Sequence, residues 1–168
     1  TVALSELKTD NHALIDMTNA KVEGGAITVS AGTKENPYDS QALTSVITGT
    51  AGSVGAALNY ARAYNNAGNI AEIIGDSGKL VARTLDVFAH GKTRAYAFIA
   101  NAGVAGLSVN VSVAQAEIGS IQKAQIMTMG EIETTAGKTG KNEADITVTS
   151  IQNNDDDHIG AFDMLFGK

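Results

Sequence analysis

Apolar and small polar residues alternate along much of this chain, and the alternation is clearest over residues 107–113 (LSVNVSV). Side chains of a β-strand point alternately to its two faces, so a period of two predicts a strand. We expect the Leu and Val side chains here to face a core and the Ser and Asn side chains to form a polar ladder on the other face. Similar patterns predict strands over residues 13–22, 26–31, 43–50, 70–74, 79–89, 94–101 and 145–151.

Turn signals separate these strands. Residues 24–25 (GG) and 75–78 (GDSG) predict turns, and the segment around Pro37, residues 33–40, predicts an exposed loop. Two segments, residues 53–66 and 113–127, fit either a helix or a strand. We favour strands, because a repeat in the sequence aligns the first of these two segments with the strict alternation above.

The chain repeats itself, imperfectly, about three times. Similar triplets begin at Ala13, Ala71 and Ala116. Between the first two copies the matches keep an offset of 58 residues, and past the Pro37 loop they resume at an offset of 51. The first offset matches Ala13, Ile15, Lys21, Ile27, Val29 and Ala31 with Ala71, Ile73, Lys79, Leu85, Val87 and Ala89. The second matches Ala51, Gly52, Gly55, Leu58 and Asn59 with Ala102, Gly103, Gly106, Val109 and Asn110.

The third copy is weaker. Residues 91–93 (GKT) recur as residues 137–139, and residues 131–133 weakly resemble residues 85–87. A period of about 50 residues is typical of solenoids, in which each unit buries its apolar face against the next. The sequence therefore predicts an all-β fold, a parallel β-helix (β-solenoid) built from about three imperfect repeats. We expect a single domain over residues 1–168, cut from a longer chain, with repeats at approximately 13–70, 71–115 and 116–168.

Composition narrows the class of protein. Four Tyr, four Phe and no Trp leave a core of Val, Ile, Leu and Ala. The net charge of −6, with Lys and Arg scattered, argues against binding to nucleic acid, which needs a basic stripe. The chain has no cysteine, which excludes disulfides and thiolate metal sites. No segment has the length of a transmembrane helix, so we expect no membrane insertion.

Several segments resemble the repeat regions of large bacterial filamentous adhesins, the haemagglutinin- and leukotoxin-like surface adhesins. Residues 104–111 (VAGLSVNV) are similar to their "GAGVSVNV" segments, residues 71–80 (AEIIGDSGKL) to their "AYIGDGAKV" turn, and residues 85–89 (LDVFA) to their "DVTVSA" strand. The likeness extends from about Ala13 to Ile151. It implies a right-handed parallel β-helix, an extracellular or bacterial cell-surface location, and adhesion or fibre formation. It brings no catalytic residues.

Candidate chemistry is sparse. Asp155, Asp156 and Asp157 form the nearest approach to a metal site, but a solvated acidic turn is the better interpretation because neither known calcium-loop motif is present. The three histidines have no shared metal spacing, and we expect His90 to be an exposed residue at a strand end. We therefore expect no catalytic residue, no cofactor and no bound metal.

These observations favour a structural or adhesive segment that acts through an extended face, and not an enzyme. Its expected partners are a surface receptor, protein or glycan, or copies of itself in a homopolymer. One alternative is a β-helix enzyme acting on acidic polysaccharide, with Asp76, Asp86 and Lys79 as its residues. A second is a small α/β binding module, which a helix over residues 53–66 would support. A core at residues 107–113 also predicts that a Val109→Asp, Val111→Asp variant unfolds.

Overall fold

A computed structural model describes residues 1–135 and 146–152, and every regular element in them is a β-strand. The prediction of an all-β fold is therefore confirmed. Residues 53–65 lie within a strand that ends at Asn65, so the helix that an α/β module would need is absent there. The strands are β1 (Val2–Leu7), β2 (Asp10–Asp16), β3 (Lys21–Ala31), β4 (Tyr38–Asn65), β5 (Gly68–Gly75), β6 (Lys79–Ile118), β7 (Ile121–Thr128), β8 (Glu131–Thr134) and β9 (Ile146–Gln152).

All of the strand pairs are parallel. One sheet has the order β1-β4-β6-β3, with β8 and β9 also paired to β6, and the second has the order β2-β5-β7. Val2 pairs with Tyr60, which in turn pairs with Val113. Three consecutive stretches of chain therefore lie side by side in the same order: residues 1–59, residues 60–112, and residues 113–135 with 146–152.

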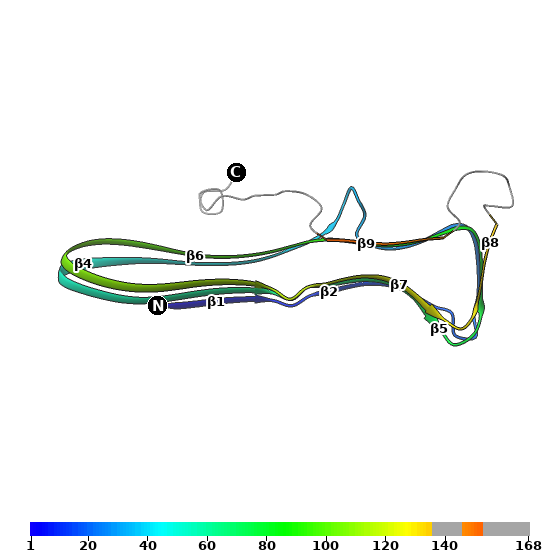
Figure 1. Cartoon of the computed structure of the whole chain (residues 1–168), viewed down its shortest axis with the longest axis horizontal. Coiled ribbons are helices and arrows are strands. Elements are labelled where there is room, and N and C mark those ends of the chain that lie inside the picture. The colour runs from blue at the N-terminus through cyan, green and yellow to red at the C-terminus, as the bar shows by residue number, and fades with distance from the viewer. Residues whose placement is uncertain (136–145, 153–168) are drawn as a thin grey trace.

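The molecule has a long, flattened outline with two different halves (Figure 1). At one end β4 and β6 each turn back on themselves, so that the first sheet folds into two closely spaced layers. We call this part, formed by β1, residues 40–65 and residues 93–118, the narrow half. The wide half contains β2, β3, β5, β7, β8, β9 and the first part of β6, and it encloses more space.

The register confirms the first repeat offset and corrects the second. Ala13 pairs with Ala71 and Lys21 with Lys79, as an offset of 58 requires. In β4 and β6 the offset is 53, not 51, since Leu58 pairs with Val111 instead of Val109. A shift of two residues leaves every side chain on the same face, so the alternation alone could not distinguish these registers.

The third copy also lies in a different register from the prediction. Ala116 pairs with Ala63, and the partner of Ala71 is Ala124. The sequence contains two similar triplets, AEI at 116–118 and AQI at 124–126, and the second pairs with residues 71–73. Residues 85–87 pair with residues 146–148, and residues 131–133 pair with residues 79–81.

The structure contains one of the two expected turns and the expected loop around Pro37. β3 continues through residues 24–25, so no turn lies there, whereas residues 75–78 do form the turn between β5 and β6. The Pro37 loop lies between β3 and β4 and starts at Gly32, whose φ is 77°. A Cβ at this position would lie 2.2 Å from the His90 carbonyl oxygen, so the bend requires glycine. Residues 137–139 lie outside the described residues.

The wide half has the aliphatic core that the composition predicts. Its middle stretch has four fully buried aliphatic side chains, those of Ile73, Leu80, Leu85 and Val87. Met17 of the first stretch is also fully buried. The register places like residues in columns, so that each inward side chain packs on its equivalent one stretch away. These columns include Ile15-Ile73-Ile126, Ala13-Ala71-Ala124, Val22-Leu80-Ile132 and Val29-Val87-Val148.

The narrow half has the opposite arrangement, and here the predicted core is wrong. Its interior contains small and polar side chains: Ser40, Ala42, Thr44, Val46, Asn59, Ala61, Ala63 and Asn65 are buried. Thr44 Oγ1 donates a hydrogen bond across the interior to the Arg62 carbonyl oxygen, at 2.8 Å. Two layers close enough for this bond leave little room between them, and Val46 is the one aliphatic side chain larger than Ala among these buried residues. Leu107, Val109, Val111 and Val113 instead point outward and are 50–63% exposed.

Candidate interaction face

The outward side of the narrow half carries a continuous group of apolar side chains from β1, β4 and β6. Each is at least half exposed, with values from 50% for Val113 to 73% for Val54. We call this group the outer aliphatic face. Its members are Val2, Leu4, Val54, Leu58, Leu107, Val109, Val111 and Val113.

Parallel register brings these residues together from distant parts of the sequence. Val54 pairs with Leu107, Leu58 with Val111, and Tyr60 with both Val2 and Val113. Valine is β-branched and suits a pleated strand, so the sequence of β6 satisfies the strand locally while exposing its larger side chains. A shallow groove crosses the face and is lined by Thr1, Val2, Leu58, Asn59, Tyr60, Val111 and Val113.

Polar and charged residues border this face where the narrow half joins the wide half. Arg62 Nη2 lies 2.6 Å from Glu117 Oε2, and this hydrogen-bonded ion pair raises the pKa of Arg62. The Tyr60 hydroxyl donates to Gln115 Oε1 at 2.9 Å. Arg62 also lies over the ring of Tyr64, 5.7 Å from its centroid. An apolar patch with a polar border is typical of an interaction site.

A network of side-chain amides supports this face from the interior. Asn59 Nδ2 donates to Thr48 Oγ1 at 3.0 Å and to Asn101 Oδ1 at 2.7 Å. Asn101 Nδ2 donates to Ser112 Oγ at 2.9 Å. Asn65 Nδ2 donates to the Arg94 carbonyl oxygen, also at 2.9 Å. These bonds link the two layers of the narrow half, which has no aliphatic core like that of the wide half.

The residues predicted for a polysaccharide-active enzyme do not form one cluster. Lys79 Nζ lies 3.0 Å from Glu131 and 3.2 Å from Glu133, and both carboxylates raise its pKa. Asp86 lies farther along β6, in the part that pairs with β9 on another side of the molecule, where its neighbours are Thr28 and Thr147 (Figure 1). Asp76 lies in the exposed turn after β5.

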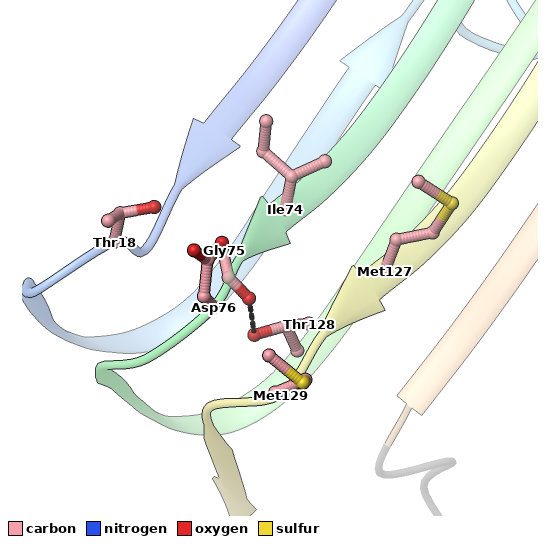
Figure 2. Close-up of a pocket in the computed structure, with 7 residues that line it drawn as sticks. All are labelled: Thr18, Ile74, Gly75, Asp76, Met127, Thr128 and Met129. Carbon is pink, nitrogen blue, oxygen red and sulfur yellow. Dashed lines mark hydrogen bonds between the residues drawn. The ribbon is translucent and has the colours of Figure 1, made fainter.

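Asp76 lines a shallow depression at the corner between β5 and β7 (Figure 2). Met127 and Met129 lie on one side and Thr18 on the other, and Thr128 Oγ1 donates to the Gly75 carbonyl oxygen at 2.8 Å. Asp76 is the one carboxylate among the lining residues. General acid–base chemistry on a glycoside uses a pair of carboxyl groups, which this depression does not supply.

Two of the three histidines, His90 and His12, contact hydrogen-bonding groups within the fold. His90 is 2% exposed, so the expectation of an exposed turn residue is wrong; its Nδ1 lies 3.0 Å from the Thr33 carbonyl oxygen in the bend before β4. His12 Nε2 lies 2.8 Å from Glu72 Oε1. A hydrogen bond from Gln125, aided by His12, lowers the pKa of Glu72.

Metal binding receives no support from the part of the chain that the structure describes. Residues 1–135 and 146–152 contain no group of three His, Asp or Glu residues that could hold a metal ion. Asp155, Asp156 and Asp157, the weak metal candidates, lie outside the described residues. The outer aliphatic face was missed by sequence reasoning, and it is an extended apolar surface that the protein's own core does not explain.

No protein-family model, curated protein or solved structure matches the chain. The similarity to filamentous adhesins therefore stays a prediction from the short segments that carry it. Among the described residues, no helix is long and apolar enough to cross a membrane.

Proposed function

We propose that this chain is a parallel β-solenoid that serves as a structural and adhesive segment of a fibrous protein, located on the bacterial cell surface or secreted. In this role it mediates attachment or filament assembly through an extended face and not through a catalytic pocket. One observation carries the proposal: the outer aliphatic face presents eight Val and Leu side chains that are each at least half exposed.

Support for a solenoid comes from the strand pairing. The same order of strands recurs in the three stretches, and each stretch meets the next through parallel pairs at offsets of 58 and then 53 residues. Inward residues of the wide half form columns across the stretches, so each stretch buries its apolar side chains against its neighbours. This is the packing that makes a repeat stable only as part of a stack.

Support for adhesion comes from the cost of the outer face. Burying a Val or Leu side chain is worth about 1.5–3 kcal/mol, and the outer aliphatic face leaves eight of them at least half exposed. Monomeric soluble proteins rarely expose an apolar patch of such extent without a partner. The partner that fits is an apolar patch on a surface receptor, protein or glycan, or on another fibre, since the face offers aliphatic contacts and few hydrogen bonds.

Attachment to a methyl-terminated surface tests this function. The variant Leu58→Thr, Val109→Thr, Val111→Thr adds hydroxyl groups to the centre of the face and keeps side chains that strands accept. We expect the retained protein to fall about ten-fold or more, because each lost aliphatic contact contributes of order 1 kcal/mol. The measurement is the mass retained on a quartz crystal microbalance after washing.

Leu14 and Met127 give a matched control, since both are exposed apolar residues on the wide half. The variant Leu14→Thr, Met127→Thr is expected to attach as the parent chain does. Equal loss in both variants, or undiminished attachment of the triple variant, would contradict a role for the outer aliphatic face.

A further inference from the structure

We propose that a second copy of this chain is the partner for filament assembly, and that it stacks head to tail. Its first stretch, β1 to β3, would pair with the third stretch of the copy below, which comprises the end of β6 together with β7, β8 and β9. This inference rests on the proposed structural function and names the surfaces and the register of the contact.

Within residues 1–135 and 146–152, both ends of the stack present strand edges. β2 and β7 are the two outer strands of the sheet β2-β5-β7, and β1 is an outer strand of the other sheet. Outer strands carry backbone N–H and C=O groups without a strand partner on one side, which favours pairing with another chain. Because all pairs within the molecule are parallel, a head-to-tail copy continues the same pairing without a change of direction.

The inward residues at the two ends match. In a copy placed one stretch farther along, three inward columns set a small residue on alanine or on a hydroxyl side chain: Ser5 on Ala116, Gly24 on Thr134 and Ala31 on Ser150. At seven other inward columns, apolar lies on apolar and amide lies on amide. These contacts are Leu7 on Ile118, Asn11 on Gln122, Ala13 on Ala124, Ile15 on Ile126, Val22 on Ile132, Ile27 on Ile146 and Val29 on Val148.

Burial differs between the middle and the end of the same columns. Leu85 and Val87 in the middle stretch are fully buried, whereas their third-stretch partners Ile146 and Val148 are 45% and 46% exposed. Ile118, also inward, is 49% exposed. A stacked copy would cover these side chains as the second stretch covers the first, so the apolar area at the end has an occupant of matching shape.

Charges at the edge of the contact have opposing effects in this register. Lys21, Lys79 and Glu131 form one column, and Lys79 Nζ bonds Glu131 at 3.0 Å between neighbouring stretches. A stacked copy would set its Lys21 beside Glu131 in the same relation. Two columns place like charges together, Glu6 on Glu117 and Glu23 on Glu133. Salt screens this repulsion, so assembly should increase with ionic strength.

Cysteine cross-linking tests the register directly, because the chain has no native cysteine. In the variant Lys21→Cys, Glu131→Cys the two thiols of one molecule lie two strand spacings apart, about 9.6 Å, too far for a disulfide. In a head-to-tail stack they lie on neighbouring strands of different copies, about 4.8 Å apart. Mild oxidation should then give a ladder of covalent oligomers on a non-reducing gel.

The controls separate this contact from random encounters. Each single-cysteine variant can form disulfide-linked dimers only, so it should give no ladder. In the variant Leu14→Cys, Glu131→Cys the two thiols are exposed but lie in different columns, so this variant should give no ladder either. A second matched pair, Asp16→Cys with Met127→Cys, lies in one column and should give the ladder again. The parent chain should form filaments by electron microscopy with an axial repeat of about 14 Å, the width of three strands.

Each outcome decides the proposal. Ladders from both matched pairs support it. Filaments without ladders, ladders from the mismatched pair, or a sample that stays monomeric in analytical ultracentrifugation at high concentration and salt would overturn head-to-tail stacking. The attachment assay on the outer aliphatic face uses monomers. It therefore tests the adhesive function independently of head-to-tail stacking.

Discussion

The two halves of this molecule share one set of parallel pairings but bury opposite kinds of residue. In the wide half, Ile73 and Val87 are fully buried and packed in aliphatic columns. In the narrow half, the fully buried positions include Ala61 and Asn65, while Val109 is 61% exposed. The comparison shows that the spacing between the sheets, and not the hydrophobicity of a strand face, determines which face lies inside. Where the two layers approach closely, the side chains between them are small or hydrogen-bonded, apart from Val46.

The two halves therefore depend on different sources of stability. The wide half is stabilised by burial of apolar area, which is non-directional and strong. The narrow half is stabilised by hydrogen bonds between Asn, Ser, Thr and the backbone, each contributing only about 1 kcal/mol in net terms. Its aliphatic side chains contribute little to folding and remain free for an interaction.

The largest expected difference between the halves comes from placing a charge in each. Val87→Asp buries an unpaired carboxylate in the wide core and should destabilise the fold by about 4 kcal/mol or more, enough to unfold it. Val109→Asp places the same group in water and should cost less than about 1 kcal/mol. Urea denaturation followed by circular dichroism measures both. A comparable loss in the two variants would remove the distinction between the halves.

The next effect concerns the amide network of the narrow half. Asn65→Ala removes the donor to the Arg94 carbonyl oxygen and leaves a gap beside Ser40, so we expect a loss of about 1–3 kcal/mol. Asn65→Leu should be worse than Asn65→Ala, because the interior is too thin for the larger apolar side chain. Thermal unfolding of the two variants gives the order. A more stable Leu variant would mean that the narrow half accepts an aliphatic core.

An effect of comparable size is expected at the bend that joins the halves. Gly32 has a φ of 77°, and a Cβ there would lie 2.2 Å from the His90 carbonyl oxygen. Gly32→Ala should cost about 1–3 kcal/mol, whereas Gly25→Ala, with open space around it, should cost almost nothing. The measurement is the difference between their urea midpoints, and equal midpoints would contradict the geometry of the bend.

The smallest expected effect depends on pH and is confined to the wide half. The pKa of Glu72 is lowered in the folded state by Gln125 and His12, so its ionised form stabilises the fold. This contribution is present above the unfolded glutamate pKa of about 4.3 and is lost as the pH falls through the lower folded value. The parent chain should be more stable than Glu72→Gln at neutral pH, with the difference vanishing in acid. A difference that does not change with pH would contradict this coupling.

Sequence patterns predicted the strands and the wide core well, for a physical reason. Alternation reports the strand directly, and the 58-residue repeat fixed the pairing of Ala13 with Ala71 because both sides carried distinctive residues. The same reasoning failed at residues 107–113, since alternation gives two faces but not which is inward. The signal that could have decided it is the run of alternate small residues Asn59, Ala61 and Ala63, whose partners in β6 continue the inward face.

Native-state thiol labelling tests the central claim, that the aliphatic residues of the narrow half face solvent. Single variants Val109→Cys and Val87→Cys place a thiol at one apolar position of each half, in a chain with no other cysteine. The account predicts that the first reacts with a maleimide about as fast as an unfolded peptide, while the second reacts only at the rate of unfolding. Protection of the cysteine at position 109 to the same degree as that at position 87 would contradict it.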